Sequence, residues 1–281
     1  MILAAAVKSY DRAMIPEHVR PWTTCDSRRL REVRGVLTDI DDTLTTEGVI
    51  PMGVAAALAA LREVGLPVLA VTGRSMGWSV PIVEGTPVAA VVAENGAVAL
   101  FREAGETRIE YAQDEAERAV NTRRLMAAAA RVLREVPGAA LARDSDGRVT
   151  DIAIDHAEFA HLSEAAIERV VAGMREEGMH ATVSSIHVNG WFGDHSKVTG
   201  ARWIVRRLLG RDLDAEREHW IYVGDSTNDQ LMFGHFPLSV GVANLADFAD
   251  RLTQWPAFIT RHDRGRGFVE VAEALLAARG R

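Results

Sequence analysis

The chain has 281 residues, long enough to bury a sizeable core in one large domain or two modest ones. Hydrophobic residues (48%) and charged residues (25%) are in the proportions of an ordinary globular protein. The net charge of −7 argues against a nucleic-acid-binding protein, because no basic surplus is present to neutralise phosphates over a broad face. A small anionic substrate stays possible, since the charge of one pocket matters more than the total.

Cysteine content and hydropathy indicate the compartment. Cys25 is the only cysteine in the sequence, so no disulfide can form within the chain, and a reducing cytoplasm fits. The apolar run Met1 to Val7 lacks a cationic start and is too short for a membrane span. We therefore expect a soluble, cytoplasmic protein with neither a membrane nor a nucleic acid as partner. The oligomeric state stays open.

Residues 1–32 are mixed in character, with two prolines and the run Arg28-Arg29-Leu30-Arg31. We expect a loosely held N-terminal extension, part of it helical. Met14 is an alternative start, because nothing before it joins the pattern of the core.

From residue 33 the sequence alternates between predicted strands and helices. Short apolar runs are typical of buried parallel strands, and Gly65 stands where a helix C-terminal cap is expected. The predicted strands are 35–38, 67–71 and 88–93, and the predicted helices are 52–64 and 75–83.

The pattern changes after the turn Glu94-Asn95-Gly96. Residues 97–192 predict an inserted α+β module: two strands, a helix (114–135), a strand (149–154), a helix (163–176) and a pair of strands (180–191). The alternation then resumes with helices at 197–209, 227–233, 245–252 and 267–278 and strands at 220–223, 238–241 and 257–260. The predicted fold class is α/β, with a doubly wound parallel (Rossmann-like) core of residues 33–96 and 193–281.

Polar side chains follow several of these strands or begin the next helix. They are Asp39, Asp41, Thr72, Lys197, Asp225 and Asp229. Ligands of doubly wound sheets bind at the carboxyl ends of the strands, so the fold is expected to gather these residues around one point.

Asp39 and Asp41 are expected to point to the same side of an extended segment. Two carboxylates are costly to bury together unless a cation or a proton compensates. Alone, the pair fits a solvated turn or a helix cap equally well. An EF-hand calcium loop fits badly, because its glycine position would hold Leu44 and its glutamate position Ile50.

A second acidic pair, Asp225 and Asp229, follows the predicted strand 220–223. Seen alone, Asp225 would be interpreted as a helix N-cap. Taken with Asp39 and Asp41, the carboxylates suit a hard, oxygen-ligated ion such as Mg²⁺. The nine histidines show no paired metal-binding spacing, which argues against zinc.

Thr72-Gly73-Arg74-Ser75 offers a hydroxyl group and main-chain N–H groups at a helix N-terminus, which suits a phosphate group. The alternative is an ordinary strand-to-helix turn. Only Lys8 and Lys197 are lysines among the 32 basic residues, so Lys197 suggests a need for a compact ammonium charge. Retention by chance is the alternative.

Together these segments resemble the haloacid dehalogenase-like (HAD) phosphohydrolase superfamily. Its four motifs are similar, in order, to DIDDTLT (39–45), VTGRS (71–75), Lys197 and VGDSTND (223–229). The insert after the third strand and AENGA (93–97) resemble the HAD-IIB subgroup, in which a larger α/β cap sits there. That subgroup includes phosphatases of sucrose, trehalose and mannosylglycerate phosphates, and also phosphomannomutases.

The resemblance implies a Mg²⁺-dependent phosphatase that hydrolyses a small phosphorylated metabolite, such as a sugar phosphate. Asp39 would be the nucleophile that forms an aspartyl-phosphate, and Asp41 the general acid and base. Asp39, the main-chain carbonyl of Asp41 and Asp225 would hold the metal. Asp229 is expected to orient water, Lys197 or the metal shell rather than to bind the metal directly.

The resemblance also implies which residues bind phosphate and substrate. Lys197 and Thr72, with main-chain N–H groups of Gly73 and Arg74, would hold the phosphoryl oxygens, and Asn228 is a further candidate for binding the substrate. Residues 97–192 would form the cap that selects the substrate.

Three residues near the end of the insert, His187, Asn189 and Trp191, alternate along an extended segment and could face a sugar ring together. The alternative is that they pack within the sheet of the insert. Glu94 and Asn95 could contact the metal shell or the substrate, or simply shape the turn.

Two other functions stay open. A phosphosugar mutase would retain the phosphate, and phosphate release with and without a bisphosphate activator separates it from a phosphatase. A non-enzymatic phospho-ligand-binding protein would show no turnover and Mg²⁺-independent affinity.

Overall fold

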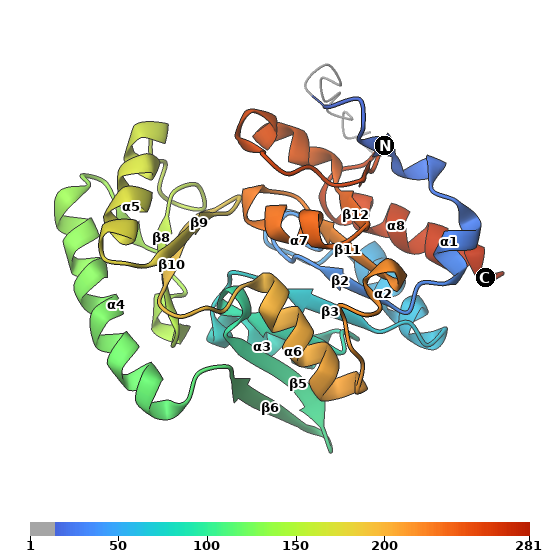
Figure 1. Ribbon diagram of the computed structural model, residues 1–281, viewed down its shortest axis with the longest axis horizontal. Helices are drawn as coiled ribbons and strands as arrows, with labels where there is room; N and C mark the ends of the chain where they lie inside the picture. Colours follow the sequence, from blue (N-terminus) through green and yellow to red (C-terminus); the bar gives the residue numbers. More distant parts are fainter. Residues whose placement is uncertain (1–14) are drawn as a thin grey trace, which may run out of the picture.

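The computed structural model describes residues 15–281, so the expectations for Met1–Val7 and for Met14 lie outside the described residues. Two β-sheets organise this part of the chain (Figure 1). The nine-stranded main sheet has the order β1 (Arg20–Pro21), β13 (Phe258–Ile259), β12 (Leu238–Gly241), β11 (Trp220–Gly224), β2 (Gly35–Thr38), β3 (Val68–Val71), β4 (Ala90–Ala93), β5 (Val98–Glu103) and β6 (Glu106–Tyr111). The second sheet has the order β7 (Ala140–Leu141), β8 (Asp151–Asp155), β10 (His187–Trp191) and β9 (His180–Val183).

The centre of the main sheet is β2, which pairs in parallel with β3 on one side and β11 on the other. From β2 the chain continues outward through β3 and β4, and it later returns to β11 and continues the opposite way through β12 and β13. The strand order therefore reverses between β2 and β11, and such a switch point is where doubly wound sheets bind ligands. The predicted α/β fold class is confirmed.

Helices cover both faces of the main sheet (Figure 1). Strand residues that alternate in direction, such as Val36 and Leu37, belong to two separate apolar clusters, one under each helix layer. One layer contains α1 (Ser27–Arg31), α2 (Met52–Glu63), α3 (Met76–Gly85) and α8 (Arg264–Ala278), and the other contains α6 (Lys197–Leu209), α7 (Gln230–His235) and the 3₁₀ helix η7 (Ala243–Arg251). None of the helices within residues 15–281 combines the length and the apolar character needed to cross a membrane.

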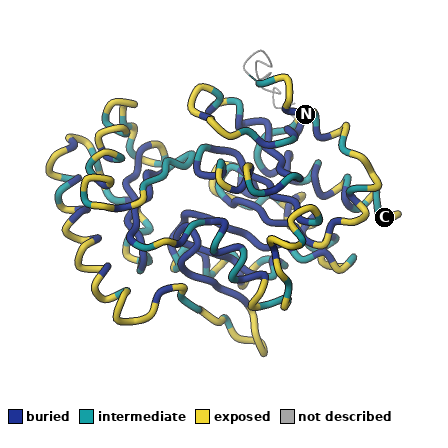
Figure 2. The backbone as a smooth tube through the Cα atoms, viewed as in Figure 1, coloured by how far each residue is buried: buried dark blue, intermediate teal, exposed yellow. Residues whose placement is uncertain are grey.

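The second sheet has one apolar and one polar face. Helices α4 (Glu115–Glu135) and α5 (Glu164–Glu176) cover the apolar face, where Val188 of β10 packs. Since side chains alternate along a strand, His187 and Asn189 occupy the opposite face, which is turned toward the main sheet. Figure 2 shows the central strands of the main sheet as buried and α4 as largely exposed on its outer side, and β8 and β10 are the buried strands of the second sheet.

The boundary of the insert differs from the prediction. We expected the insert to begin at residue 97, but β5 and β6 extend the main sheet as antiparallel strands. They do so because residues 98–101 are apolar and buried, and pair with β4 along their whole length. The second sheet and its helices therefore belong to the chain after β6. The predicted helix at 245–252 is a 3₁₀ helix instead.

The expectation of a loosely held extension is wrong for residues 15–32. Strand β1 pairs with β13 at the edge of the main sheet, and α1 packs on α8. Trp22 is only 2% exposed and meets the ring of Phe258 edge to face, with centroids 5.6 Å apart. Burial of this ring, together with the β1–β13 pairing and the packing of α1 on α8, anchors the segment, and local composition could not reveal these contacts.

We predict that Trp22→Ala lowers the free energy of unfolding by about 3–5 kcal/mol, because it empties a large buried volume. Met52→Ala is the control, since Met52 is 90% exposed and its truncation should cost less than about 0.5 kcal/mol. Urea unfolding of the two variants makes the comparison. Equal midpoints for both would show that the N-terminal segment is not part of the core.

Candidate active site

Asp39 and Asp225 end the two strands at the switch point of the main sheet. Asp39 follows β2 and donates its N–H to the carbonyl of Val223 in β11 (2.8 Å). Asp225 follows β11, and both carboxylates are buried. Because β2 and β11 are parallel neighbours, their ends bring the two residues together with Asp229. One carboxylate oxygen of each of the three lies within 4.8 Å of the others.

Lys197 joins this cluster from the first position of α6. Ser196 caps the N-terminus of α6, so the helix begins at Lys197. Its ammonium group donates to Asp39 Oδ1 (2.6 Å) and Asp229 Oδ1 (2.7 Å). Burial opposes a charged lysine, but Asp229 and Asp39 together raise the pKa of Lys197 above its ordinary value. Burial raises the pKa of Asp39 to about 8, although Lys197 counteracts this effect.

Asp229 has hydrogen-bond donors at both carboxylate oxygens. Oδ1 accepts from Lys197 and from the hydroxyl of Tyr222, and Oδ2 accepts from the N–H groups of Asp225 (2.9 Å) and Ser226 (3.2 Å). Gly224 leaves the space for this, because a Cβ there would lie 2.4 Å from Oδ2. This arrangement suits a residue that orients Lys197 and the Asp225 loop.

Within residues 15–281, only one carboxylate oxygen of Asp225 has a hydrogen-bond partner. Asn244 donates to Oδ2 (3.2 Å), while the buried Oδ1 has no hydrogen-bond partner among residues 15–281. Burial, together with the charges of Asp39 and Asp229, raises the pKa of Asp225 well above its usual value. A partnerless carboxylate oxygen beside two further carboxylates fits a hard divalent cation, which would be held by Asp39 and Asp225.

The Asp41 carboxylate is directed away from this cluster. Arg74 binds it in a bidentate manner, through Nε (3.0 and 2.9 Å) and Nη2 (2.9 Å). The same guanidinium group binds Glu158 (2.8 Å), which is also bonded to His187 Nε2 (2.9 Å). Burial opposes the charge of Glu158, but the bonds from His187 and Arg74 lower its pKa to about 2. The donors of Arg74 are therefore largely committed to these two carboxylates.

A small cavity of about 10 Å³ lies between Asp39 and the second sheet. Residues of the main-sheet part line it, namely Asp39, Asp41 and segment 72–74. Residues 184–187 and Asn189 line it from the part of the chain that contains the second sheet. A space of this size holds about one water molecule. The structure thus brings His187 and Asn189 to the same cavity as Asp39, Asp41 and Thr72.

Trp191 does not reach this cavity. Its indole N–H donates to the carbonyl of His195 (3.0 Å), and its ring is stacked between His180 and His195. Of the two alternatives for Trp191, packing within its own part of the chain is the one that these contacts favour, and the ring does not share the small cavity with His187 and Asn189.

Two larger cavities also border Asn228. A cleft of about 1230 Å³ separates α5 and β9 from α7, and a neighbouring cavity of about 450 Å³ extends to Lys197 and Trp191. Thr182 and Asn228 line both, so the two cavities are neighbours, and Lys197 lines the smaller one. Asn228 also borders the small cavity beside Asp39.

Glu94 and Asn95 connect the two sheets rather than touching the carboxylate cluster. Glu94 is fully buried and accepts from the N–H groups of Met76 (2.9 Å) and Thr150 (2.6 Å). Asn95 donates to Asp151 (3.2 Å). Both have positive φ angles, as a tight turn requires. Of the two roles expected for them, shaping the turn is the one that the contacts favour.

Several site residues were missed at the level of sequence. Tyr222 and Asn244 hold the acidic cluster, and Arg148 and Glu158 join the second sheet to segment 72–74. The only available signal was indirect: a tyrosine in a strand that is otherwise apolar, and an arginine placed four residues after Asp144.

Comparisons with known proteins agree with this geometry. Residues 36–126 match the family model described as haloacid dehalogenase-like hydrolase. No curated protein matches the sequence.

Solved structures share the fold. The sucrose-phosphatase from Synechocystis sp., solved with sucrose and phosphate, superposes with a TM-score of 0.62 at 13% identity, covering 87% of this chain and 98% of that one. A Thermoplasma acidophilum protein gives 0.61 at 16%, covering 86% and 98%. A sugar phosphatase of HAD subclass IIB gives 0.59 at 15%, covering 86% and 98%.

The fold is doubly wound α/β with an acidic cluster at its switch point, and the family model that matches residues 36–126 is one of hydrolases. The match of residues 36–126 to the haloacid dehalogenase-like hydrolase model confirms the resemblance of the motifs, and the solved structures share the fold.

We predict a specific pH dependence from His195, which borders the cavity beside Lys197. Burial lowers the pKa of His195 to about 4, below the ordinary 6.5. Between these values the unfolded chain binds a proton that the folded chain does not, so stability falls as the pH is lowered from 6.5 to 4. His195→Phe, which keeps a ring to stack on Trp191, should reduce the loss between pH 7 and pH 5 by about 2 kcal/mol.

Urea unfolding at both pH values measures this effect. His161→Phe is the control, because His161 is exposed. An unchanged pH dependence in His195→Phe would contradict the assignment of His195 as a buried neutral imidazole.

Proposed function

We propose that the chain is a Mg²⁺-dependent phosphatase that hydrolyses a small phosphorylated metabolite through an aspartyl-phosphate at Asp39. The observation that carries the proposal is the buried cluster of Asp39, Lys197 and Asp225 at the switch point, with one partnerless oxygen on Asp225. Such a cluster provides a nucleophile, a cationic partner and oxygen ligands within one site.

In the first step a carboxylate oxygen of Asp39 attacks phosphorus, and the bond from phosphorus to the leaving oxygen breaks. Asp41 gives that oxygen a proton. In the second step Asp41 takes a proton from water, the water oxygen bonds to phosphorus, and the bond to Asp39 breaks. A Mg²⁺ ion held by Asp39, the carbonyl of Asp41 and Asp225 would neutralise charge on the phosphoryl oxygens.

Lys197 and segment 72–74 would bind the phosphoryl group. The Lys197 ammonium lies 2.6 Å from Asp39 and is kept charged by Asp229. Thr72, Gly73 and Arg74 line the small cavity beside Asp39, which is where we propose that the phosphate binds.

For the side chain of Arg74 we propose a role separate from that of its main-chain N–H. Its bonds to Asp41 and Glu158 leave little capacity for phosphate, so we propose that it orients the Asp41 carboxylate. A guanidinium shared by two carboxylates can shift toward Glu158 when Asp41 becomes protonated, which suits a group that alternates between acid and base.

The substrate class that we propose is a sugar phosphate. Two of the similar structures are a sucrose-phosphatase and a sugar phosphatase, and a third is described as a trehalose-6-phosphate phosphatase related protein. In this chain the cleft beside Asn228 offers Thr182, Arg175 and the edge of the aromatic stack at His180, a mixture that suits a hydroxylated ring. We propose that the second sheet with α4 and α5 is the cap that selects the substrate.

We predict that Asp39→Asn abolishes turnover, because an amide oxygen is a far weaker nucleophile, while the fold is retained. Phosphate release from a panel of sugar phosphates with Mg²⁺, in the presence and absence of a bisphosphate activator, is the measurement. Asp42→Asn is the matched control: Asp42 pairs with Arg264 outside the cluster, and asparagine tolerates its positive φ.

Wild-type rates in Asp39→Asn would remove Asp39 as the nucleophile. Release that depends on the bisphosphate would indicate a mutase. Turnover that is unaffected by removal of divalent ions with a chelator would contradict the metal requirement.

A further inference from the structure

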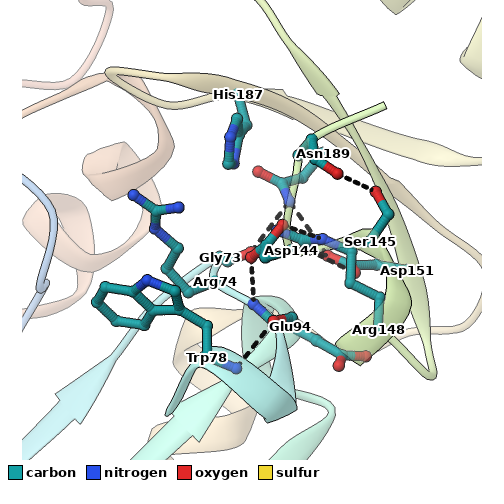
Figure 3. A network of polar contacts seen from close by, with 12 residues as sticks. Gly73, Arg74, Trp78, Glu94, Asp144, Ser145, Arg148, Asp151, His187 and Asn189 are labelled. Carbon is teal, nitrogen blue, oxygen red and sulfur yellow. Dashed lines mark hydrogen bonds and ion pairs between the residues drawn. The ribbon is translucent and has the colours of Figure 1, made fainter. Parts of the chain in front are cut away.

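A buried ionic network connects segment 72–76 with the second sheet (Figure 3). Its centre is Arg148, which lies just before β8 and whose side chain is only 2% exposed. The guanidinium group donates to Asp144 (3.0 Å), to Asp151 (2.7 Å) and to the main-chain carbonyl of Gly73 (2.9 Å). A cation from the segment that leads into the second sheet thus holds the backbone of the segment that lines the Asp39 cavity.

Glu94 makes a complementary connection. Its carboxylate is completely buried, and its hydrogen-bond partners are four neutral donors. They are Met76 N, Val149 N, Thr150 N and Thr150 Oγ1. The first donor belongs to α3, directly after segment 72–75, and the others lie directly before β8 of the second sheet. A buried carboxylate is tolerated only when its oxygens are satisfied in this way, so Glu94 fixes the relative position of the two parts.

Other contacts at this place hold the same backbone. Asp144 accepts from the N–H of Ser75 (3.1 Å), and Asn189 donates to the carbonyl of Gly73 (3.1 Å). Gly77 and Gly147 are in direct backbone contact, since a Cβ on either would lie 3.1 Å from the Cα of the other. The main chain from Gly73 to Gly77 is therefore held at successive positions, largely from the second sheet.

We propose that Arg148 and Glu94 are positioning residues that hold segment 72–76 in its phosphate-binding conformation, so that this part of the second sheet is a fixed wall of the site. The proposal rests on the proposed function for the identity of the ligand, but the position of the segment can be measured without it. The physical reason is that the donors of a phosphate site act through their geometry, and a displacement of about 1 Å can cost a hundredfold in rate. Neither residue touches the cavity beside Asp39.

The test compares Arg148→Met with Arg131→Met in the full chain. Arg131 of α4 also forms several ion pairs, but these lie on the surface. Its partners are Glu135, Glu176 and Glu177. Amide hydrogen exchange at residues 73–76 should rise about tenfold or more in Arg148→Met and stay unchanged in Arg131→Met. The turnover number should fall about tenfold to a hundredfold, with weaker inhibition by inorganic phosphate, only in Arg148→Met.

Conservative variants extend the test if Arg148→Met does not fold. Arg148→Lys keeps the charge but cannot reach three acceptors at once, so its exchange and rate should lie between those of Arg148→Met and the wild type. Glu94→Gln places an NH₂ group against backbone donors and should also raise exchange at residues 73–76.

Wild-type exchange and wild-type phosphate inhibition in Arg148→Lys and Glu94→Gln would overturn the proposal. An inactive wild-type chain would contradict the proposed function instead, and hydrogen exchange alone would then decide whether the two residues position the segment.

Discussion

The contact on which the site depends is the ammonium group of Lys197 between the carboxylates of Asp39 and Asp229. All three groups are buried, and an unpaired charge in this position would cost several kcal/mol. The surrounding fold supplies what the contact needs. The switch point brings Asp39 and Asp225 together, Ser196 sets the start of α6, and Tyr222 completes the coordination of Asp229. With Asp225 the ionised cluster has three carboxylates against one ammonium group, so two negative charges are left over, and a divalent cation between Asp39 and Asp225 would balance them.

Much of this arrangement could be predicted from sequence, because it follows from local patterns. Apolar runs defined the strands, and polar residues at their ends marked one edge of the sheet. The sequence alone therefore predicts that Asp39, Thr72, Lys197 and Asp225 lie close together, and the roles assigned to them are proposals. The inserted α+β module was also predicted, although β5 and β6 belong to the main sheet.

The parts that could not be predicted depend on contacts between distant segments. The segment around Trp22 has no periodicity of its own and becomes ordered because its ring packs on Phe258. The direction of Trp191 is set by the loop at His195, and not by its alternation with Asn189. Arg148 and Glu94 carry no motif signal, since each becomes meaningful only when the second sheet is placed against Gly73 and Met76. Sequence thus predicted the residues nearest the chemistry better than those that hold them in place.

The most direct test of the account is calorimetric titration of the chain with Mg²⁺, without substrate, for the wild type and Asp225→Asn. The asparagine keeps the size of Asp225 and removes the charge and the partnerless carboxylate oxygen. The account predicts one Mg²⁺ per wild-type chain and an affinity at least about tenfold lower in Asp225→Asn, which corresponds to about 1.4 kcal/mol. Equal affinity in the two proteins, or no binding in either, would contradict the claim that the buried acidic cluster is a metal site.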